Sequence, residues 1–171
     1  MTDSSKREQW AEFLEEFQAE SDRACAVLGA AFLGEQLRSL LTAFLVDDLA
    51  QVEGLFEGAA APLSSFASRT QMAYMLGFLS PSQHRDLDLI RRIRNKFAHD
   101  LHGVSFTSPS IASRCAELAG CNVIGNALGD MGPRSRFVVT VAMLSQWIPL
   151  RRLGIGDSRR QVQPEAKQAN V

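Results

Sequence analysis

The sequence predicts an all-α protein that folds as a single helical-bundle domain around a long central helix. Apolar residues recur at intervals of three and four along nearly every segment, which is the spacing of one face of an α-helix. The dipeptide Ser80-Pro81 marks a helix start, with serine at the N-cap and proline at the first helical position. With 171 residues, 46% of them apolar, the chain has the size and composition of one domain with a real core.

The N-terminal part predicts a short helix followed by the central one. Aromatic and leucine side chains spaced three or four apart indicate an amphipathic helix over residues 7–18. Ser21 and Asp22 then offer an N-cap for a long helix over roughly 22–46. This helix carries two stripes with helical spacing, and the second contains the charged residues Glu35 and Arg38. A helix that is apolar over so much of its surface is expected at the centre of a bundle.

The remaining elements follow from capping residues and breaks in the apolar pattern. The predicted helices are, in order, 49–56, a helix capped by Ser64 or Ser65 that runs through residue 79, 81–99, 111–118 and 136–150, with a connector over 104–110 and a loop or weak helix over 120–135. Residues 137–141 have strand propensity, but no partner strand is evident, so a helix is favoured. The helical domain is therefore assigned to residues 1–153. The polar, unpatterned residues 154–171 are predicted to be a flexible, disordered tail.

The composition excludes several classes of function. The net charge is −1 at pH 7, so no global positive field draws the protein to nucleic acid. The N-terminus has no apolar signal region, and the apolar runs are interrupted before a membrane-spanning length. Three cysteines without a CxxC pair, namely Cys25, Cys115 and Cys121, indicate buried thiols in a reducing compartment. We therefore expect a cytoplasmic protein without a membrane partner.

Motifs for cofactors and metals are also missing from the sequence. There is no GxxxxGK[ST] phosphate loop, no GxGxxG fingerprint and no GxSxG elbow. No cluster of His, Cys, Asp and Glu has metal-ligand spacing. We therefore expect neither a cofactor nor a metal.

Several charged residues fall where the helical spacing predicts burial. Arg94 lies on the apolar stripe of the 81–99 helix, and a buried guanidinium requires a carboxylate or other acceptors. Glu35 is predicted to pair with Arg94 or with Arg69 across the core, which would fix how the helices pack. The predicted buried polar network comprises Glu35, Arg38, Arg69 and Arg94. If Glu35 is buried in this way, its substitution by alanine is expected to cost about 3–5 kcal/mol.

The segment 94–99 (RNKFAH) contains the candidate catalytic residues Arg94, Asn95 and His99. As a ribonuclease site, His99 would act as general acid or base on a 2′-hydroxyl, and Arg94 would stabilise charge on the scissile phosphate. Asn95 would orient His99 or a phosphate oxygen. On a regular helix, however, Arg94 and His99 point about 140° apart, so they meet only if the helix frays, Arg94 reaches over, or two copies meet. Alternatively, His99 only binds the last carbonyls of the helix.

Five segments in the same order resemble the mannitol operon repressor family of bacterial proteins. They are 21–24 (SDRA), 33–38 (LGEQLR), 62–69 (PLSSFASR), 74–79 (YMLGFL) and 86–99 (DLDLIRRIRNKFAH). The resemblance covers roughly residues 20–120. It implies an all-helical transcriptional regulator without a recognisable DNA-binding domain, so that repression runs through partner proteins. The sequence agrees, because its only strongly basic helix, 81–99, has Arg94 on the apolar stripe and so does not resemble an exposed recognition helix.

The arrangement of Arg94, four residues and His99 also resembles the signature of the HEPN superfamily. That resemblance implies a helical, usually dimeric domain, and in many members a metal-independent ribonuclease with this arginine and histidine as the catalytic pair. The leading hypothesis is therefore a non-enzymatic regulator that acts through protein contacts, as a homodimer, with a partner such as a DNA-binding regulator. The alternatives are a HEPN-type endoribonuclease acting on RNA, or an inactive relative, and an oligomeric scaffold. The regulator hypothesis predicts an exposed apolar patch.

Overall fold

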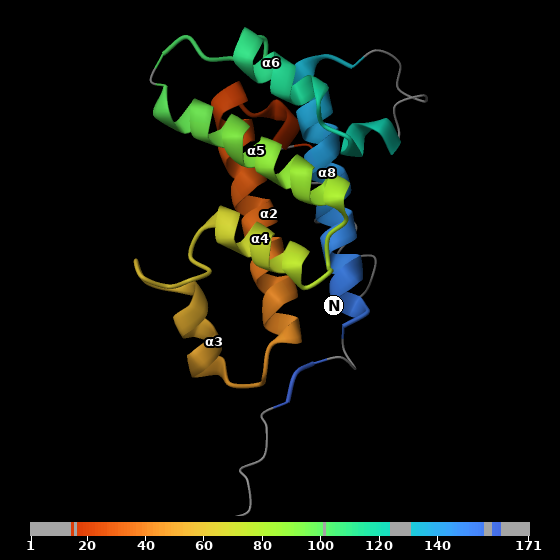
Figure 1. Cartoon of the computed structure of the whole chain (residues 1–171). Coiled ribbons are helices and arrows are strands. Elements are labelled where there is room, and N and C mark those ends of the chain that lie inside the picture. The colour runs from red at the N-terminus through yellow and green to blue at the C-terminus, as the bar shows by residue number, and fades with distance from the viewer. Residues whose placement is uncertain (1–14, 16, 101, 124–130, 156–158, 162–171) are drawn as a thin grey trace, which may run out of the picture.

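The structure of the protein, a computed structural model, describes residues 15, 17–100, 102–123, 131–155 and 159–161. These residues form helices and connecting loops, and none of them belongs to a β-strand. The elements are α2 (Asp22–Phe44), α3 (Leu49–Phe56), α4 (Phe66–Met75), α5 (Pro81–His99), α6 (Pro109–Ala116), the 3-10 helix η1 (Gly120–Val123) and α8 (Pro133–Leu153) (Figure 1). The prediction of a single all-α helical domain is confirmed.

Helix α2 is the central helix of the bundle. The hydroxyl of Ser21 caps it by accepting a hydrogen bond from the Ala24 N–H at 3.2 Å, as its position before an acidic first turn predicted. The helix packs against α4, α5 and α8 and buries one stripe completely, whereas the stripe with Glu35 and Arg38 lies largely at the surface. By length and composition alone α2 could cross a membrane, but half of its most apolar window is buried inside the bundle. Its apolar character therefore fits a core helix.

Helices α2 and α8 lie side by side and run in the same direction (Figure 1). At their first turns, Arg134 forms an ion pair with Asp22. Beyond their last turns, the N–H of Arg160 donates to the carbonyl of Phe44 at 2.9 Å. Gly29 permits their close approach, since a Cβ at this position would lie 3.3 Å from the ring of Phe137 on α8. Helix α5 packs on both long helices, and α4 packs on α2 and α5.

Residues 137–141, which have strand propensity, are helical and belong to α8. Its buried residues Phe137, Val141, Leu144 and Ile148 are spaced four, three and four, which is the period of a helix face and not of a strand. Packing against α2, α6 and η1 outweighs the β-propensity of the valines. The helix is longer than predicted, because it begins at Pro133 and continues to Leu153.

Helix α5 has the predicted bounds and a complete capping box. The Ser80 hydroxyl accepts from the Gln83 N–H at 3.2 Å, and the Gln83 side chain accepts from the Ser80 N–H at 2.9 Å. Pro81 occupies the first turn, where its missing N–H is not needed. Two paired orphan N–H groups fix the helix start and therefore the direction in which α5 crosses α2.

Two other elements differ from the sequence prediction in their bounds. Helix α4 ends at Met75 instead of Leu79, because Gly77 adopts a positive φ of 77° and the Phe78 N–H returns to the Ala73 carbonyl at 3.0 Å. Helix α6 covers residues 109–116 instead of 111–118. The connector before α6 contains turns without regular extended structure.

The two ends of the chain are described only in part. Of the predicted helix 7–18, residues 15 and 17–18 are helical and the rest lies outside the described residues. Of the predicted tail 154–171, Ile155 is buried and Arg159 donates to the carbonyl of Leu45 at 3.0 Å. These contacts differ from the expectation of a flexible segment, because Ile155 is buried and Arg159 and Arg160 find partners at the end of α2. The remaining residues of the tail are outside the described part.

The three cysteines are all buried and unpaired, as predicted. Burial raises the pKa of Cys25 and of Cys115 to about 12, so both remain thiols at neutral pH. Among the described residues no group of His, Cys, Asp and Glu could hold a metal ion. The cysteines therefore act as small core residues of α2, α6 and η1.

Candidate functional site

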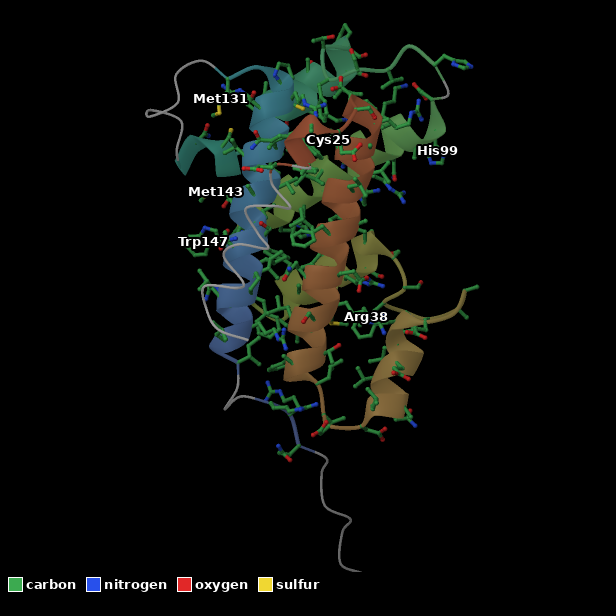
Figure 2. All side chains as sticks on the ribbon, turned by 180° about the vertical axis from the view of Figure 1, so that it is seen from behind. Cys25, Arg38, His99, Met131, Met143 and Trp147 are labelled. Atoms are coloured by element: carbon green, nitrogen blue, oxygen red, sulfur yellow. The ribbon has the colours of Figure 1, made fainter. Side chains whose placement is uncertain are left out.

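The residues of the Arg94–His99 motif do not form one cluster within the chain. Arg94 is exposed, and its Nη1 donates to the Oδ1 of Asn95 at 3.1 Å. His99 is also exposed and is the last residue of α5 (Figure 2). The helix is regular up to His99, so the two side chains project about 140° apart. A general acid-base pair on one substrate would require a second copy of the chain.

The end of α5 is bound by a residue other than the predicted histidine. The guanidinium of Arg23 on α2 donates to the carbonyl of Phe97 and, at 2.6 Å, to the carbonyl of Asp100. These are the carbonyls that a helix leaves without an intrahelical partner. A capping role for His99 is therefore not seen, and Arg23 fixes the end of α5 against α2.

Arg94 is not buried, contrary to the prediction from its stripe. The buried residues of α5 in this region are Ile90, Ile93 and Phe97, and Arg94 lies at the edge of the arc that they define. Leu87, at a similar angle two turns earlier, is buried because other elements cover that end of the helix. The spacing gave the angle of Arg94 correctly, but it could not show where along α5 the neighbouring helices stop.

Arg94 lines a hollow of about 510 Å³ between α2, the start of α4 and α5, which we call the Arg94 hollow. The α2 side is formed by small residues, and the α5 side by Arg91, Arg94 and Asn95. The full lining is Ala30, Ala31, Gly34, Glu35, Ser64, Ser65, Phe66, Ala67, Arg69, Arg91, Arg94 and Asn95. His99 does not line this hollow. The hollow presents guanidinium groups to solvent, and its lining includes no histidine.

Arg69 is the buried member of the predicted polar network, with 9% of its surface exposed. Its Nε donates to the carbonyl of Leu63 at 2.8 Å, and its Nη1 donates to the carbonyl of Gly34 at 3.1 Å. The same Nη1 lies 3.0 Å from the Oε1 of Glu35. The predicted Glu35–Arg69 pair is therefore present. Backbone carbonyls, however, provide most of the acceptors for this buried guanidinium.

The other three members of that network are not buried, and the prediction is wrong on this point. Glu35 keeps 68% of its side chain exposed while it pairs with Arg69. Arg38 forms an ion pair with Glu57 at 2.9 Å and lies over the ring of Phe56, with 30% of its side chain exposed. Because α2 faces the open side of the bundle at these positions, the second stripe carries a surface network. Such exposed pairs contribute little to stability.

Most other cations of α5 are paired along the helix surface. Asp88 accepts from Arg91 at 2.6 Å and from Arg92 at 2.7 Å, and Lys96 pairs with Asp100 at 2.7 Å. Burial would raise the pKa of Asp88, but the hydrogen bonds and charges of the two arginines lower it below its ordinary value. No ion pair is found for Arg94 within the described part of the chain. The basic character of α5 is thus largely neutralised in place.

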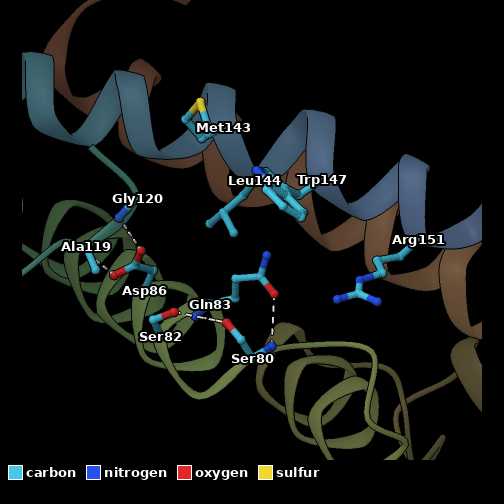
Figure 3. A pocket seen from close by; sticks show the side chains of 10 residues that line it. All are labelled: Ser80, Ser82, Gln83, Asp86, Ala119, Gly120, Met143, Leu144, Trp147 and Arg151. Carbon is cyan, nitrogen blue, oxygen red and sulfur yellow. Dashed lines mark hydrogen bonds between the residues drawn. The ribbon is translucent and has the colours of Figure 1, made fainter. Parts of the chain in front are cut away.

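A second concave surface lies at the opposite end of α5, where Figure 3 shows α5 and η1 facing α8. It encloses about 340 Å³, and we call it the Trp147 groove. At its base Asp86, 2% exposed, accepts from the Ala119 N–H at 2.9 Å and the Gly120 N–H at 2.7 Å. Burial raises the pKa of Asp86, although both hydrogen bonds and the charge of Arg85 oppose this. Asp86 thereby attaches η1 to α5.

Sequence reasoning missed both Asp86 and the residues of α8 in this groove. A signal existed for Asp86, because it is four, seven and eleven residues before Ile90, Ile93 and Phe97 and thus on the buried face. For Trp147 there was no equivalent signal, since residues 136–150 are apolar in all directions and do not show which face is covered.

The comparison with protein-family models decides the family. The model described as "Mannitol repressor" matches residues 11–141, which is most of the chain. The chain belongs to the mannitol repressor family. The matched region contains the Arg94 hollow, Asp86 and the Arg94–His99 motif. The last turns of α8, with Trp147, lie beyond it.

A solved structure gives the fold of the mannitol repressor family in three dimensions. One chain of the "X-ray structure of the MtlR-HPr complex from Escherichia coli" matches with a TM-score of 0.65 and 22% sequence identity. The match covers 81% of this chain and 97% of that chain. At this identity the likeness shows the fold, and it agrees with the all-helical prediction. No curated protein sequence matches this family member significantly.

Proposed function

We propose that this mannitol repressor family member is a cytoplasmic regulator of transcription that acts through protein–protein contacts and does not read DNA directly. The observation that carries this proposal is that a protein of the same fold was solved in a complex with the protein HPr. HPr or a similar small protein is therefore the proposed partner, and a DNA-binding regulator would be a further one.

The surface charges support protein contacts over DNA contacts. A DNA-reading helix presents unpaired basic and amide side chains to the major groove. On α5, which has more Lys and Arg residues than any other described helix, Arg91 and Arg92 share Asp88, Arg85 pairs with Glu117 and Lys96 with Asp100, which leaves only Arg94 without an acidic partner among the described residues. With a net charge of −1, the chain also lacks the field that drives association with a polyanion.

Two titrations test the proposal. The purified protein should be titrated with HPr from the same bacterium by isothermal calorimetry, and separately with the promoter DNA of the operon that encodes it. We expect saturable binding of HPr and no specific retention of the promoter fragment at physiological salt. Specific DNA binding that competitor DNA does not remove would contradict the proposal, as would a complete lack of HPr binding.

A homodimeric ribonuclease is the second candidate, and one observation favours it. Arg94 is exposed on the Arg94 hollow, has no carboxylate partner among the described residues and therefore could contact a phosphate. In a homodimer with a two-fold axis near α5, the His99 of one copy could reach the Arg94 hollow of the other. Within one chain the two residues remain apart.

A cleavage assay separates the two candidates. Unstructured RNA is incubated without metal with the wild type, Arg94→Ala and His99→Ala. The regulator proposal expects no cleavage above buffer by any of the three proteins. Metal-independent cleavage that is lost in both variants would establish the ribonuclease instead. Both residues are exposed, so the variants should remain folded, which circular dichroism would verify.

A further inference from the structure

The Trp147 groove combines an exposed aromatic wall with a buried carboxylate that is already hydrogen-bonded. Leu144, Trp147 and Arg151 of α8 form one wall, and the first turns of α5 with Gln83 and Asp86 form the other (Figure 3). The residues of η1 close one end of the groove, while Arg151 stands near the other. The groove is therefore a slot between helices that is open to solvent along its length.

The apolar wall of the groove is unusually exposed for a helix of the core. Trp147 is 44% exposed, although its neighbours Leu144 and Ile148 are buried against the bundle. One turn further, Leu150 is 62% exposed. Large apolar residues that lie together on one exposed face mark interaction surfaces, and tryptophan is the residue most enriched among those that dominate binding energy.

The polar groups of the groove leave a specific charge pattern. The Asp86 carboxylate is occupied by two backbone N–H groups, and the Gln83 carbonyl oxygen is occupied by the Ser80 N–H. The Gln83 amide nitrogen and the Arg151 guanidinium remain as donors, beside the Ser80 and Ser82 hydroxyls, which can donate or accept. Among the described residues, no carboxylate pairs with Arg151. A complementary surface therefore offers an apolar side chain next to a carboxylate.

We propose that the Trp147 groove is the docking site for the protein partner HPr, which inserts an apolar side chain between Trp147 and the facing first turns of α5 and pairs a carboxylate with Arg151. This inference rests on the proposed function, because it assigns the surface through which that function acts. It places the partner at the N-terminal end of α5, away from the Arg94 hollow and away from the Arg94–His99 motif.

The experiment uses two pairs of matched variants of the full chain and HPr as the probe. Trp147→Ala is compared with Met75→Ala, which removes an even more exposed apolar side chain from α4 (69% exposed, against 44% for Trp147). Arg151→Glu is compared with Arg152→Glu, which makes the same charge change one residue further, at an exposed position that does not line the groove. Thermal unfolding followed by circular dichroism verifies that all four variants are folded. Dissociation constants are measured by calorimetry at two salt concentrations.

We expect Trp147→Ala to weaken HPr binding about thirtyfold or more, as truncation of an interface tryptophan does. Arg151→Glu should weaken it about tenfold and should reduce its dependence on salt, because the ion pair is lost. Met75→Ala and Arg152→Glu should remain within about twofold of the wild type. The difference within each pair attributes the loss to the groove and not to general apolarity or charge.

The outcomes distinguish this inference from the proposed function. If the wild type binds HPr and the groove variants bind it equally well, the docking site is wrong and the proposed function stands. If the wild type does not bind HPr, the proposed function fails and this assignment fails with it. Sedimentation velocity supplies the remaining outcome: self-association of the wild type that Trp147→Ala abolishes would mean that a second copy occupies the groove, which also overturns the proposal.

Discussion

Two residues carry buried charges in the described part of the molecule, and they lie in different regions. Arg69 lies beneath the Arg94 hollow, and Asp86 lies at the base of the Trp147 groove. Neither meets a buried residue of opposite charge. Arg69 donates to the carbonyls of Leu63 and Gly34, whereas Asp86 accepts from the N–H groups of Ala119 and Gly120. Buried charged side chains are usually expected to pair with a side chain of opposite charge. In both regions, backbone groups are the main partners instead.

The two regions differ in what lies around the buried charge. Arg69 also pairs with Glu35, whose carboxylate is largely in solvent, so its surroundings are polar and open. Asp86 has no ion pair among the described residues and is only 2% exposed, so burial raises its pKa. A polar, charged hollow and an apolar groove with a saturated acid suit different ligands. The comparison teaches that the conspicuous sequence motif and the more suitable docking surface are at opposite ends of one helix.

The largest effect is expected where a buried guanidinium is removed. Arg69→Ala should lower the free energy of unfolding by about 3 kcal/mol, because several carbonyls lose their donor and a cavity is left beside Phe56. Chemical denaturation measures the loss. Arg85→Ala is the matched control, since its pair with Glu117 is exposed and should contribute less than about 1 kcal/mol. Equal losses in the two variants would contradict the assignment of a structural role to Arg69.

A somewhat smaller loss is expected at the other buried charge. Asp86→Ala should cost about 2 kcal/mol, because the N–H groups of Ala119 and Gly120 lose their acceptor and η1 is released from α5. Asp88→Ala, two residues away on the helix surface, should cost less than about 1 kcal/mol although Asp88 makes more ionic contacts. A larger loss in the free energy of unfolding for Asp88→Ala than for Asp86→Ala would contradict this prediction.

The same two carboxylates should respond to pH in opposite directions. The folded-state pKa of Asp86 is raised, so its contribution to stability is greatest below the ordinary value of 3.8 and is lost as the pH rises through the folded pKa. The folded-state pKa of Asp88 is lowered, so its contribution is present above 3.8 and is lost as the pH falls through the folded pKa.

The measurement follows from the sign of each shift. The free energy of unfolding of the wild type is compared with those of Asp86→Asn and Asp88→Asn between about pH 2 and 7, around the ordinary carboxyl values. The difference between the wild type and Asp88→Asn should shrink as the pH falls. As the pH falls, the wild type should instead become more stable relative to Asp86→Asn. If the free energies of unfolding of the two variants change with pH in the same way, Asp86 and Asp88 do not have oppositely shifted pKa values, and the prediction is wrong.

The smallest effect is expected at Glu35. Because its side chain is 68% exposed and Arg69 keeps its backbone acceptors without it, Glu35→Ala should cost less than about 1 kcal/mol. The sequence had suggested about 3–5 kcal/mol for a buried pair. Urea denaturation of the variant distinguishes these values directly. A loss of 3 kcal/mol or more would mean that the ion pair, and not the backbone, holds the guanidinium in place.

The positions of the helices followed closely from the sequence. The Ser21 cap, the Ser80-Pro81 start and the apolar spacing of α5 are local signals, and the structure has α2 and α5 where they indicated. The early end of α4 at Met75 did not follow, because Gly77 in a positive-φ conformation terminates the helix while the apolar pattern continues to Leu79. The spacing of apolar residues shows which face of a helix is buried, but it does not show at which residue the helix ends.

The candidate sites were less accessible to sequence reasoning. Arg94 and Leu87 have similar angles on α5, and only one of them is covered by other elements. Arg23 took the capping role considered for His99 because α2 brings it to the last carbonyls of α5 from 74 residues away. The Trp147 groove arises from α5, η1 and α8 together, so no single segment contains its pattern.

The sequence by itself determined the helical class, most helix starts, the burial of the cysteines and the family, because these depend on local periodicity, capping and the order of segments. The tertiary structure decided which charges are buried, which ends of α5 are open and what partners each polar group finds. The physical reason is that burial is a property of what packs against a residue. The angular position of a residue on its helix shows whether it can be buried. Whether it is buried depends on which neighbouring helices cover that position.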